Sequence, residues 1–174
     1  CIVVAENMAG TEEAFAAKMT QKAKKLGLKN STFRNATGIP HPEHLMSAKD
    51  LALLSQHIIN DYPENYKIYS QKEFTFNGIK QGNRNPLLYE IEGADGLKTG
   101  HTEKSGFGLT GSVKTADGRR LILVVNGLKN MSDRRTETKK LMDWGIGAFE
   151  NIDMYSIGQE VEPIPVWLFS RRSQ

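Results

Sequence analysis

The stretch that decides the fold is Gly96-Leu97-Lys98-Thr99-Gly100-His101-Thr102. It predicts a strand that bears a Lys-Thr-Gly triplet and runs into a polar turn. Residues 106–117 predict a second strand, Asp117-Gly118 predicts a hairpin turn, and residues 119–127 predict a very apolar third strand. We expect the second and third strands to pair.

Helical patterns flank this region. A last helix is predicted from Ser132 to Phe149, because Ser132 and Asp133 suit a helix start. Its candidate buried residues are Leu141, Trp144, Ile146 and Phe149. At the other end, residues 2–9 predict the end of a helix that closes at Gly10, and Thr11 followed by two glutamates predicts a new helix start. One face of that helix carries Phe15, Met19, Ala23 and Leu26.

The middle of the chain alternates between loops and short elements. Residues 28–46 support no regular element and are predicted to be a loop. Ser47 to Asp50 resembles a capping box that opens a helix ending at Asp61-Tyr62-Pro63. Its candidate buried residues are Leu51, Leu54, Ile58 and Ile59. A short helix over 64–70 and a strand over 72–77 are expected to follow.

These elements together predict a mixed α/β fold of the α+β kind, with an antiparallel sheet flanked by helices. We assign residues 1–150 to this domain and residues 151–174 to the start of a β-rich domain broken by Gly158, Pro163 and Pro165. Residues 1–5 begin inside an apolar segment with no capping residue, so we expect the first domain to be incomplete at its N-terminus.

Composition bounds the function. The 174 residues are 39% hydrophobic and 25% charged, which is typical of a globular chain with one sizeable core. The net charge is only +3, and the basic run on the second helix is interpreted as its solvated face, so we expect no nucleic-acid partner. Cys1 has no second cysteine to pair with, and no apolar stretch is long enough to span a bilayer. His41, His44 and His57 lack metal-ligand spacing, and no cofactor or metal is expected.

A Lys-Thr-Gly triplet alone is a weak signal, but several further segments occur with it in a characteristic order. Those segments include residues 77–85, 93–102, 125–127, 141–145 and 163–167. In this order they resemble the low-molecular-weight penicillin-binding proteins, the serine-type D-alanyl-D-alanine carboxypeptidases. The resemblance implies the second half of a serine β-lactamase-like or DD-peptidase-like domain, followed by the entry into a second domain.

The same resemblance shows what the sequence lacks. The family carries its nucleophile in Ser-x-x-Lys and a further serine in Ser-x-Asn, and neither motif occurs here. Ser47 comes closest, but its fourth residue is Asp50 and a capping role is sufficient for it. Without a serine and a lysine to accept its proton, we expect the isolated chain to be inactive.

The resemblance assigns roles to residues of the Lys-Thr-Gly strand. It implies that Lys98 contributes to the electrostatic field of the site, that Thr99 binds the terminal carboxylate of the substrate, and that the backbone N–H of His101 forms half of an oxyanion hole. The ring of His101 is better interpreted as a surface group. Gly100 permits close approach of a peptide because it has no Cβ, and Thr102 is expected to order the following turn.

Arg84 and Arg134 match arginines that the family places around its active site, where a guanidinium can hold a carboxylate by two hydrogen bonds. Each has a structural alternative. Arg134 is expected in the first turn of the last helix, where it could pair with Asp133 or Glu137. Arg84 could instead anchor its own loop by a hydrogen bond.

The resemblance implies removal of the terminal D-alanine from peptidoglycan pentapeptide stems through an acyl-enzyme, with β-lactams as inhibitors. It implies a periplasmic or extracytoplasmic location, with the longer parent protein associated with the membrane. The missing N-terminal portion, or self-association, is expected to cover the exposed apolar faces. Two alternatives stay open: a β-lactamase or endopeptidase of the same fold, and a non-catalytic module that binds peptidoglycan stems.

Overall fold

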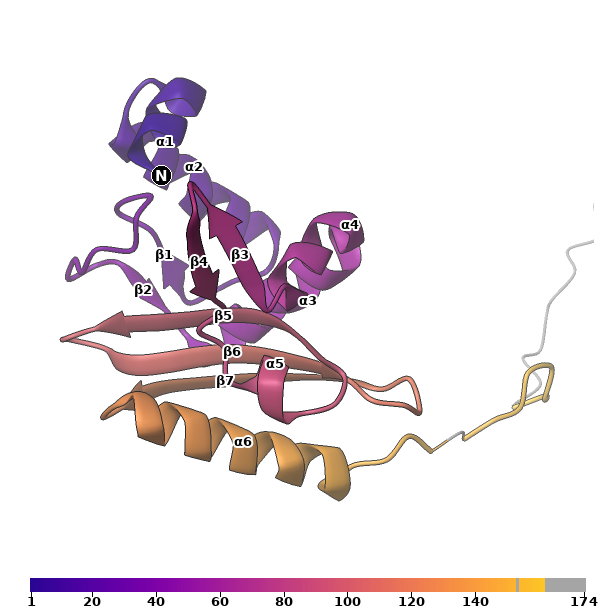
Figure 1. Ribbon diagram of the computed structural model, residues 1–174. Coiled ribbons are helices and arrows are strands. Elements are labelled where there is room, and N and C mark those ends of the chain that lie inside the picture. Colours follow the sequence, from indigo (N-terminus) through magenta and orange to yellow (C-terminus); the bar gives the residue numbers. More distant parts are fainter. Residues whose placement is uncertain (153, 162–174) are drawn as a thin grey trace, which may run out of the picture.

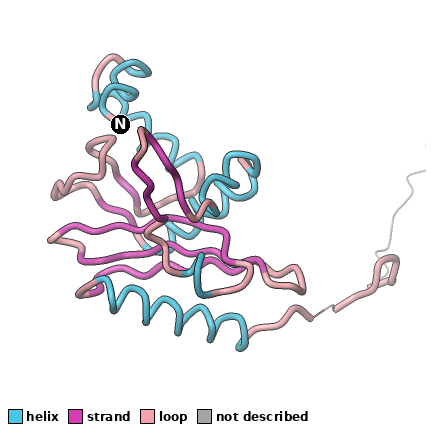
Figure 2. Tube along the Cα trace, in the orientation of Figure 1, coloured by secondary structure: helices cyan, strands magenta, loops and turns pink. Residues whose placement is uncertain are grey.

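A three-stranded antiparallel sheet forms the centre of the computed structural model, which describes residues 1–152 and 154–161. Its strands are β5 (Ala94–Thr102), β6 (Gly106–Lys114) and β7 (Arg120–Leu128), in that spatial order. Figures 1 and 2 show them as a meander across the middle of the molecule. The predicted strands, including the pairing of the second with the third, are confirmed.

Helices lie on both sides of this sheet. The long α6 (Met131–Ala148) packs along one face, below the sheet in Figure 1, and α3 (Ala48–Asp61) contacts β7 and β6 above it. The core between α6 and the sheet consists of Leu87, Leu109, Val113 and Met142. Leu87 belongs to a short helix, α5 (Leu87–Glu90), that the sequence did not predict. The expectation of an antiparallel sheet flanked by helices therefore holds.

The buried face of α6 differs from the predicted one. Leu141, Trp144 and Phe149 are 40%, 61% and 57% exposed, and only Ile146 of the predicted set packs against the core. The residues that α6 buries are Arg134, Thr138, Met142 and Gly145. The prediction was wrong because three of these four residues are not large and apolar, so the buried stripe carries no hydrophobic signal. The N-cap is Asn130, whose side chain accepts from the N–H of Asp133, rather than Ser132.

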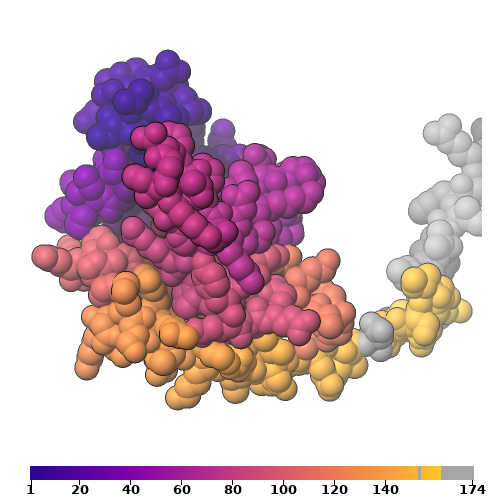
Figure 3. Space-filling model, in the orientation of Figure 1, coloured from indigo at the N-terminus to yellow at the C-terminus, as the bar shows by residue number. Residues whose placement is uncertain are grey.

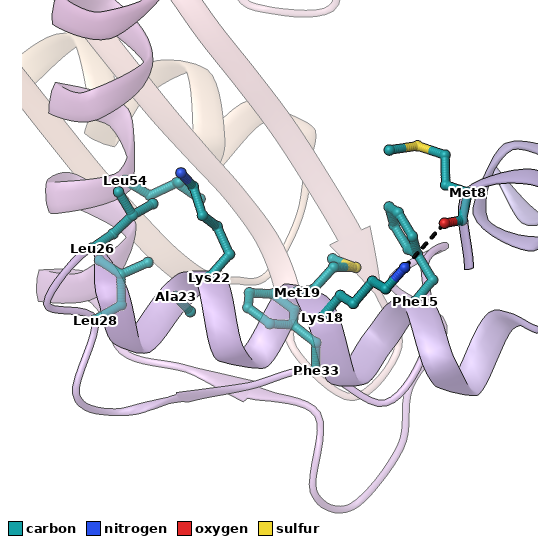
Figure 4. Close-up of a pocket in the computed structure, with 10 residues that line it drawn as sticks. All are labelled: Met8, Phe15, Lys18, Met19, Lys22, Ala23, Leu26, Leu28, Phe33 and Leu54. Carbon is teal, nitrogen blue, oxygen red and sulfur yellow. Dashed lines mark hydrogen bonds between the residues drawn. The ribbon is translucent and has the colours of Figure 1, made fainter.

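The N-terminal helices begin and end as predicted. Helix α1 (Ile2–Ala9) closes at Gly10 with φ at 86°, and the Thr11 hydroxyl caps α2 (Glu12–Lys25) by accepting from the N–H of Ala14 at 3.1 Å. The apolar face of α2 lines a pocket of about 390 Å³ with residues from α1, α3 and the loop after α2 (Figure 4). Lys18 lies at this pocket and donates from Nζ to the backbone oxygen of Met8 at 3.1 Å.

Asp50 takes a different role from that of a capping box. Ser47 caps α3 by accepting from the N–H of Asp50 at 3.1 Å, as predicted. The Asp50 carboxylate, however, accepts from the N–H of Asn30 and the hydroxyl of Ser31, both at 2.7 Å. It is therefore buried as an anchor for the segment before α3. Of the residues expected on the buried face of α3, Leu51, Leu54, Ile58 and Ile59 are only partly buried.

The loop predicted over residues 28–46 contains two short strands, β1 (Ser31–Thr32) and β2 (Leu45–Met46), which pair with each other. Two-residue strands are too short to show a periodic pattern, which is why the sequence did not reveal them. The short helix predicted next is α4 (Pro63–Tyr66) followed by a 3₁₀ turn, η1 (Lys67–Ser70).

A two-stranded hairpin follows these short helices. Strands β3 (Glu73–Phe76) and β4 (Ile79–Gly82) pair around Asn77 and Gly78, which both have positive φ. The space-filling view shows this hairpin at the surface, in magenta (Figure 3). Phe74, Phe76 and Ile79 are more than half exposed on it. The β-rich module predicted after residue 150 lies largely outside the described residues, and the described part of it contains no strand.

Candidate active site

A pocket of about 690 Å³ opens at the end of β5 that carries the Lys-Thr-Gly triplet. All seven residues singled out from the sequence line it, although they come from three separate segments of the chain. These residues are Arg84, Lys98, Thr99, Gly100, His101, Thr102 and Arg134. The fold therefore brings together side chains that the sequence separates by up to 50 positions.

Strand β5 is an edge strand, which pairs only with β6 in the described sheet. Residues that pair across two neighbouring strands have their side chains on the same face of the sheet. Thr99 pairs with Leu109 and therefore lies on the face that packs against α6. Lys98 pairs with Thr110 and therefore lies on the opposite face. Lys98 is exposed, and its Nζ donates to the backbone oxygen of Thr99 at 2.6 Å. The free edge of β5 leaves main-chain groups available to an extended peptide.

Gly100 leaves open space where a side chain would stand. A Cβ built at this position would meet no atom within 4 Å, and the residue has no positive φ. A larger residue at position 100 would therefore extend into the pocket rather than collide with the protein. This agrees with the predicted close approach of a ligand to the backbone.

Thr102 orders the turn that follows β5, as predicted. Its hydroxyl accepts from the N–H of Ser105 at 3.0 Å and lies 2.6 Å from the Ser105 hydroxyl. Ser105 also lines the pocket. The turn is therefore fixed by the last residue of the strand itself.

Arg134 is buried at the start of α6 and is only 7% exposed. Its guanidinium carbon lies 5.6 Å from the ring centroid of Phe107, and its Nε has no hydrogen-bond partner. Burial lowers the pKa of Arg134, and the positive charge of Arg84 lowers it further. No ion pair joins Arg134 to Asp133 or Glu137 within the described residues, so the alternative proposed for this arginine does not hold there.

The loop that carries Arg84 is anchored by the next residue, Asn85. The side chain of Asn85, which is fully buried, donates to the backbone oxygen of Gly96 at 2.8 Å and accepts from the N–H of Leu87 at 3.1 Å. Asn85 thus anchors the loop to β5, which is the task suggested as an alternative for Arg84. Arg84 itself is exposed and lines the pocket.

The ring of His101 is exposed and stacks on Phe107, with centroids 3.9 Å apart and an interplanar angle of 28°. This arrangement agrees with its interpretation as a surface ring. The backbone of His101 belongs to β5 opposite Phe107. The backbone N–H of His101, to which the resemblance gives a role in the oxyanion hole, therefore belongs to an edge strand beside the pocket.

The charged residues that line the pocket are all basic. Lys98, Arg84 and Arg134 supply three cations, and no aspartate or glutamate is among its lining residues. An anionic group that enters the pocket meets positive charge, and two of the donors are guanidinium groups, which suit carboxylates. The geometry therefore favours a ligand with a carboxylate and an extended backbone.

Sequence reasoning gave no role to several other lining residues, among them Thr37, Gly38, Phe107 and Asn126. Thr37 and Gly38 lie in the long segment that was predicted to be a loop. Asn126 lies across from Gly108, where a Cβ would come within 2.5 Å of its Oδ1. Only the pairing of β6 with its neighbours brings Phe107 and Asn126 to the pocket, so no local pattern reveals them.

The remaining histidines have partners outside the pocket, and Nδ1 of His41 accepts from the N–H of Glu43 at 3.1 Å. His44 packs edge-on against Phe33 with centroids 5.4 Å apart, and Nδ1 of His57 lies 3.0 Å from the carboxylate of Asp61. Among the described residues, no cluster of three metal-ligating side chains occurs. Over the same residues, no helix combines the length and the apolar character needed to cross a bilayer.

The comparisons with known proteins identify the family. The family model described as D-alanyl-D-alanine carboxypeptidase, peptidase S11, matches residues 1–130. This chain therefore belongs to that family of penicillin-binding proteins, whose members are peptidoglycan-related hydrolases.

The chain matches part of the length of two relatives and of two solved structures. It is 40% identical to carboxypeptidase DacA of Haemophilus influenzae over 99% of the chain and 44% of that protein, and 42% identical to Escherichia coli DacA over 96% and 41%. Penicillin binding protein 5 from H. influenzae superposes with a TM-score of 0.78 at 44% identity, covering 83% of the chain and 42% of that structure. DacD from Francisella tularensis gives 0.83 at 31% identity, covering 92% and 51%. The chain thus spans less than half the length of the curated relatives named here.

A third structure was solved with a β-lactam. Penicillin-binding protein D2 from Listeria monocytogenes, in its ampicillin-bound form, has a TM-score of 0.75 at 33% identity. The match covers 83% of this chain and 60% of that structure.

Proposed function

We propose that this chain supplies the substrate-binding half of a serine-type D-alanyl-D-alanine carboxypeptidase. The observation that carries the proposal is the pocket beside the free edge of β5, which has three cations and no carboxylate among its lining residues. A peptide that ends in D-alanyl-D-alanine offers a backbone for the strand edge and a carboxylate for the cations. The pocket supports a ligand with these two features, and the D-alanyl-D-alanine part of the proposal comes from the family.

In this proposal the peptide stem adds to β5, and its terminal carboxylate is bound by Thr99 with Arg84 and Arg134 nearby. Lys98 lies on the opposite face of the strand from Thr99 and supplies positive potential to the reacting groups. The backbone N–H of His101 donates to the oxyanion. Hydrogen bonds of this kind lower the barrier only when they are aimed at the charge that develops in the transition state.

The nucleophile must come from outside the 174 residues, since they contain neither Ser-x-x-Lys nor Ser-x-Asn. The serine oxygen attacks the carbonyl of the penultimate D-alanine, the amine of the last D-alanine leaves with a proton, and water then hydrolyses the acyl-enzyme. β-Lactams inhibit the complete enzyme by acylating the same serine. No metal or organic cofactor enters these steps.

Labelling with a fluorescent penicillin tests the proposal. The 174-residue chain is expected to take up no label, whereas a polypeptide that joins it to a Ser-x-x-Lys-containing segment of the same gene is labelled and releases D-alanine from a pentapeptide. If the gene encodes no such serine and the chain still binds D-alanyl-D-alanine peptides, the protein is a stem-binding module. Release of β-lactam hydrolysis product without D-alanine release would instead indicate a β-lactamase.

We also propose that the complete protein lies in the periplasm or on the outer face of the cytoplasmic membrane, because the proposed substrate is the peptidoglycan stem. Fractionation with an antibody against this chain tests the location. A signal confined to the cytoplasmic fraction would contradict it.

A further inference from the structure

Phe107 has no role in the proposed function, yet it contacts two residues that do. Its ring stacks on His101 at 3.9 Å between centroids, and the guanidinium carbon of Arg134 lies 5.6 Å from its centre. Phe107 is only partly buried and lines the pocket itself. One aromatic ring therefore joins the end of β5 to the start of α6.

The environment of Arg134 shows why this contact matters. Nε of Arg134 has no hydrogen-bond partner, and the guanidinium forms no ion pair within the described residues. Burial lowers the pKa of Arg134 and the positive charge of Arg84 lowers it further, so the charged guanidinium would be expected to turn toward water. A cation within about 6 Å of an aromatic centroid is attracted to the ring. The Phe107 ring therefore opposes this reorientation.

We propose that Phe107 is a positioning residue, which packs on the His101 ring and holds the Arg134 guanidinium where it can receive a substrate carboxylate. The part of this inference that concerns a carboxylate rests on the proposed function. The part that concerns geometry does not, because the stack exists without any ligand. Phe107 touches no reacting atom and acts only through its two neighbours.

The chain offers matched variants. Phe107→Leu removes the ring and keeps an apolar side chain, whereas Phe107→Tyr keeps the ring. Phe74→Leu, at an exposed phenylalanine of β3 that does not line the pocket, is the control for the same substitution elsewhere. Circular dichroism and the methyl resonances of Leu109 and Val113, both in the core, verify that each variant is folded.

Nuclear magnetic resonance of the ligand-free 174-residue chain tests the geometry. Ring currents of Phe107 are expected to shift the Arg134 Nε–H and His101 ring-proton signals in the wild type, in Phe107→Tyr and in Phe74→Leu. In Phe107→Leu these shifts are expected to disappear while the core methyl signals stay in place. Unchanged Arg134 and His101 signals in Phe107→Leu would overturn the proposal, whatever the binding data.

Titration with N-acetyl-D-alanyl-D-alanine then tests the consequence. The dissociation constant is expected to rise about five- to thirtyfold in Phe107→Leu, which corresponds to the loss of one largely buried cation–π contact. It should return to the wild-type value in Phe107→Tyr. Equal affinities of the wild type and Phe107→Leu would refute the positioning role. A wild-type chain that binds no dipeptide counts against the proposed function, and the ring-current shifts then decide the inference on Phe107 alone.

Discussion

The carboxylate of Asp95 on β5 accepts from Nη1 of Arg120 on β7, with both oxygens at 2.6 Å, so that the two outer strands are joined across β6. The same Nη1 also donates to the hydroxyl of Ser112 on β6, and the Tyr66 hydroxyl donates to Asp95 at 2.7 Å. Burial raises the pKa of Tyr66, which keeps this hydroxyl a donor. This cluster fixes the end of β5 that precedes Lys98.

We expect the Asp95–Arg120 pair to stabilise the sheet by about 1 kcal/mol, the upper end for a partly exposed ion pair. A double-mutant cycle with Asp95→Ala and Arg120→Ala, followed by urea unfolding, measures the coupling. The exposed Lys139–Asp143 pair of α6 is the control, and about 0.3–0.5 kcal/mol is expected for it. If the two cycles give the same coupling energy, the Asp95–Arg120 pair stabilises the protein no more than an ordinary exposed ion pair does.

Met142 and Leu141 test which face of α6 is buried. Met142 is 2% exposed in the core, so Met142→Ala should lower the free energy of unfolding by about 2–5 kcal/mol. Leu141→Ala, one position away and 40% exposed, should change it by less than about 1 kcal/mol. Urea unfolding of both variants is the measurement, and a larger loss for Leu141→Ala would restore the face predicted from the sequence.

That comparison also shows where sequence reasoning succeeds. The strands of the central sheet and the caps at Thr11 and Ser47 follow from local chemistry, and the structure has them as predicted. The face of α6 does not follow, because its buried positions include Arg134, Thr138 and Gly145. Such residues are buried for reasons that lie in other elements of the fold.

The residues of the pocket also divide into those that the sequence predicted and those that it did not. Its seven predicted residues were found by resemblance to a family rather than by spacing, and the fold does bring them together. Phe107 was not predicted, because a lone aromatic residue in a strand looks like an ordinary core position. Its place beside His101 and Arg134 depends on strand register and on the start of α6, neither of which a local pattern contains.

Asp50 gives the protein a predictable response to acid. The hydrogen bond from the Ser31 hydroxyl lowers the pKa of this buried carboxyl more than burial raises it, and the N–H of Asn30 and the hydroxyl of Ser47 lower it further. A group with a depressed folded pKa stabilises the fold at pH values above its unfolded pKa of about 3.9. That stabilisation is lost as the pH falls from there through the folded value.

The urea midpoint of the wild type should therefore fall more steeply than that of Asp50→Asn between pH 4 and pH 2, while Asp50→Asn is the less stable of the two at pH 7. The exposed Asp143→Asn variant should follow the wild type. Parallel curves for the wild type and Asp50→Asn would show that this carboxylate makes no contribution to acid sensitivity.

Substitutions at Gly100 are expected to weaken ligand binding with little effect on the free energy of unfolding. A Cβ at this position meets nothing within 4 Å, and β-branched residues are well tolerated in strands. The free energy of unfolding should therefore change by less than about 0.5 kcal/mol in Gly100→Ala and Gly100→Val. The affinity for N-acetyl-D-alanyl-D-alanine should fall in the order Gly, Ala, Val, by tenfold or more for Val, because the added carbons fill the space beside the strand edge. Calorimetric titration and urea unfolding of the same samples give both quantities. A Val variant that binds as tightly as the wild type would mean that the peptide does not lie against β5 at Gly100.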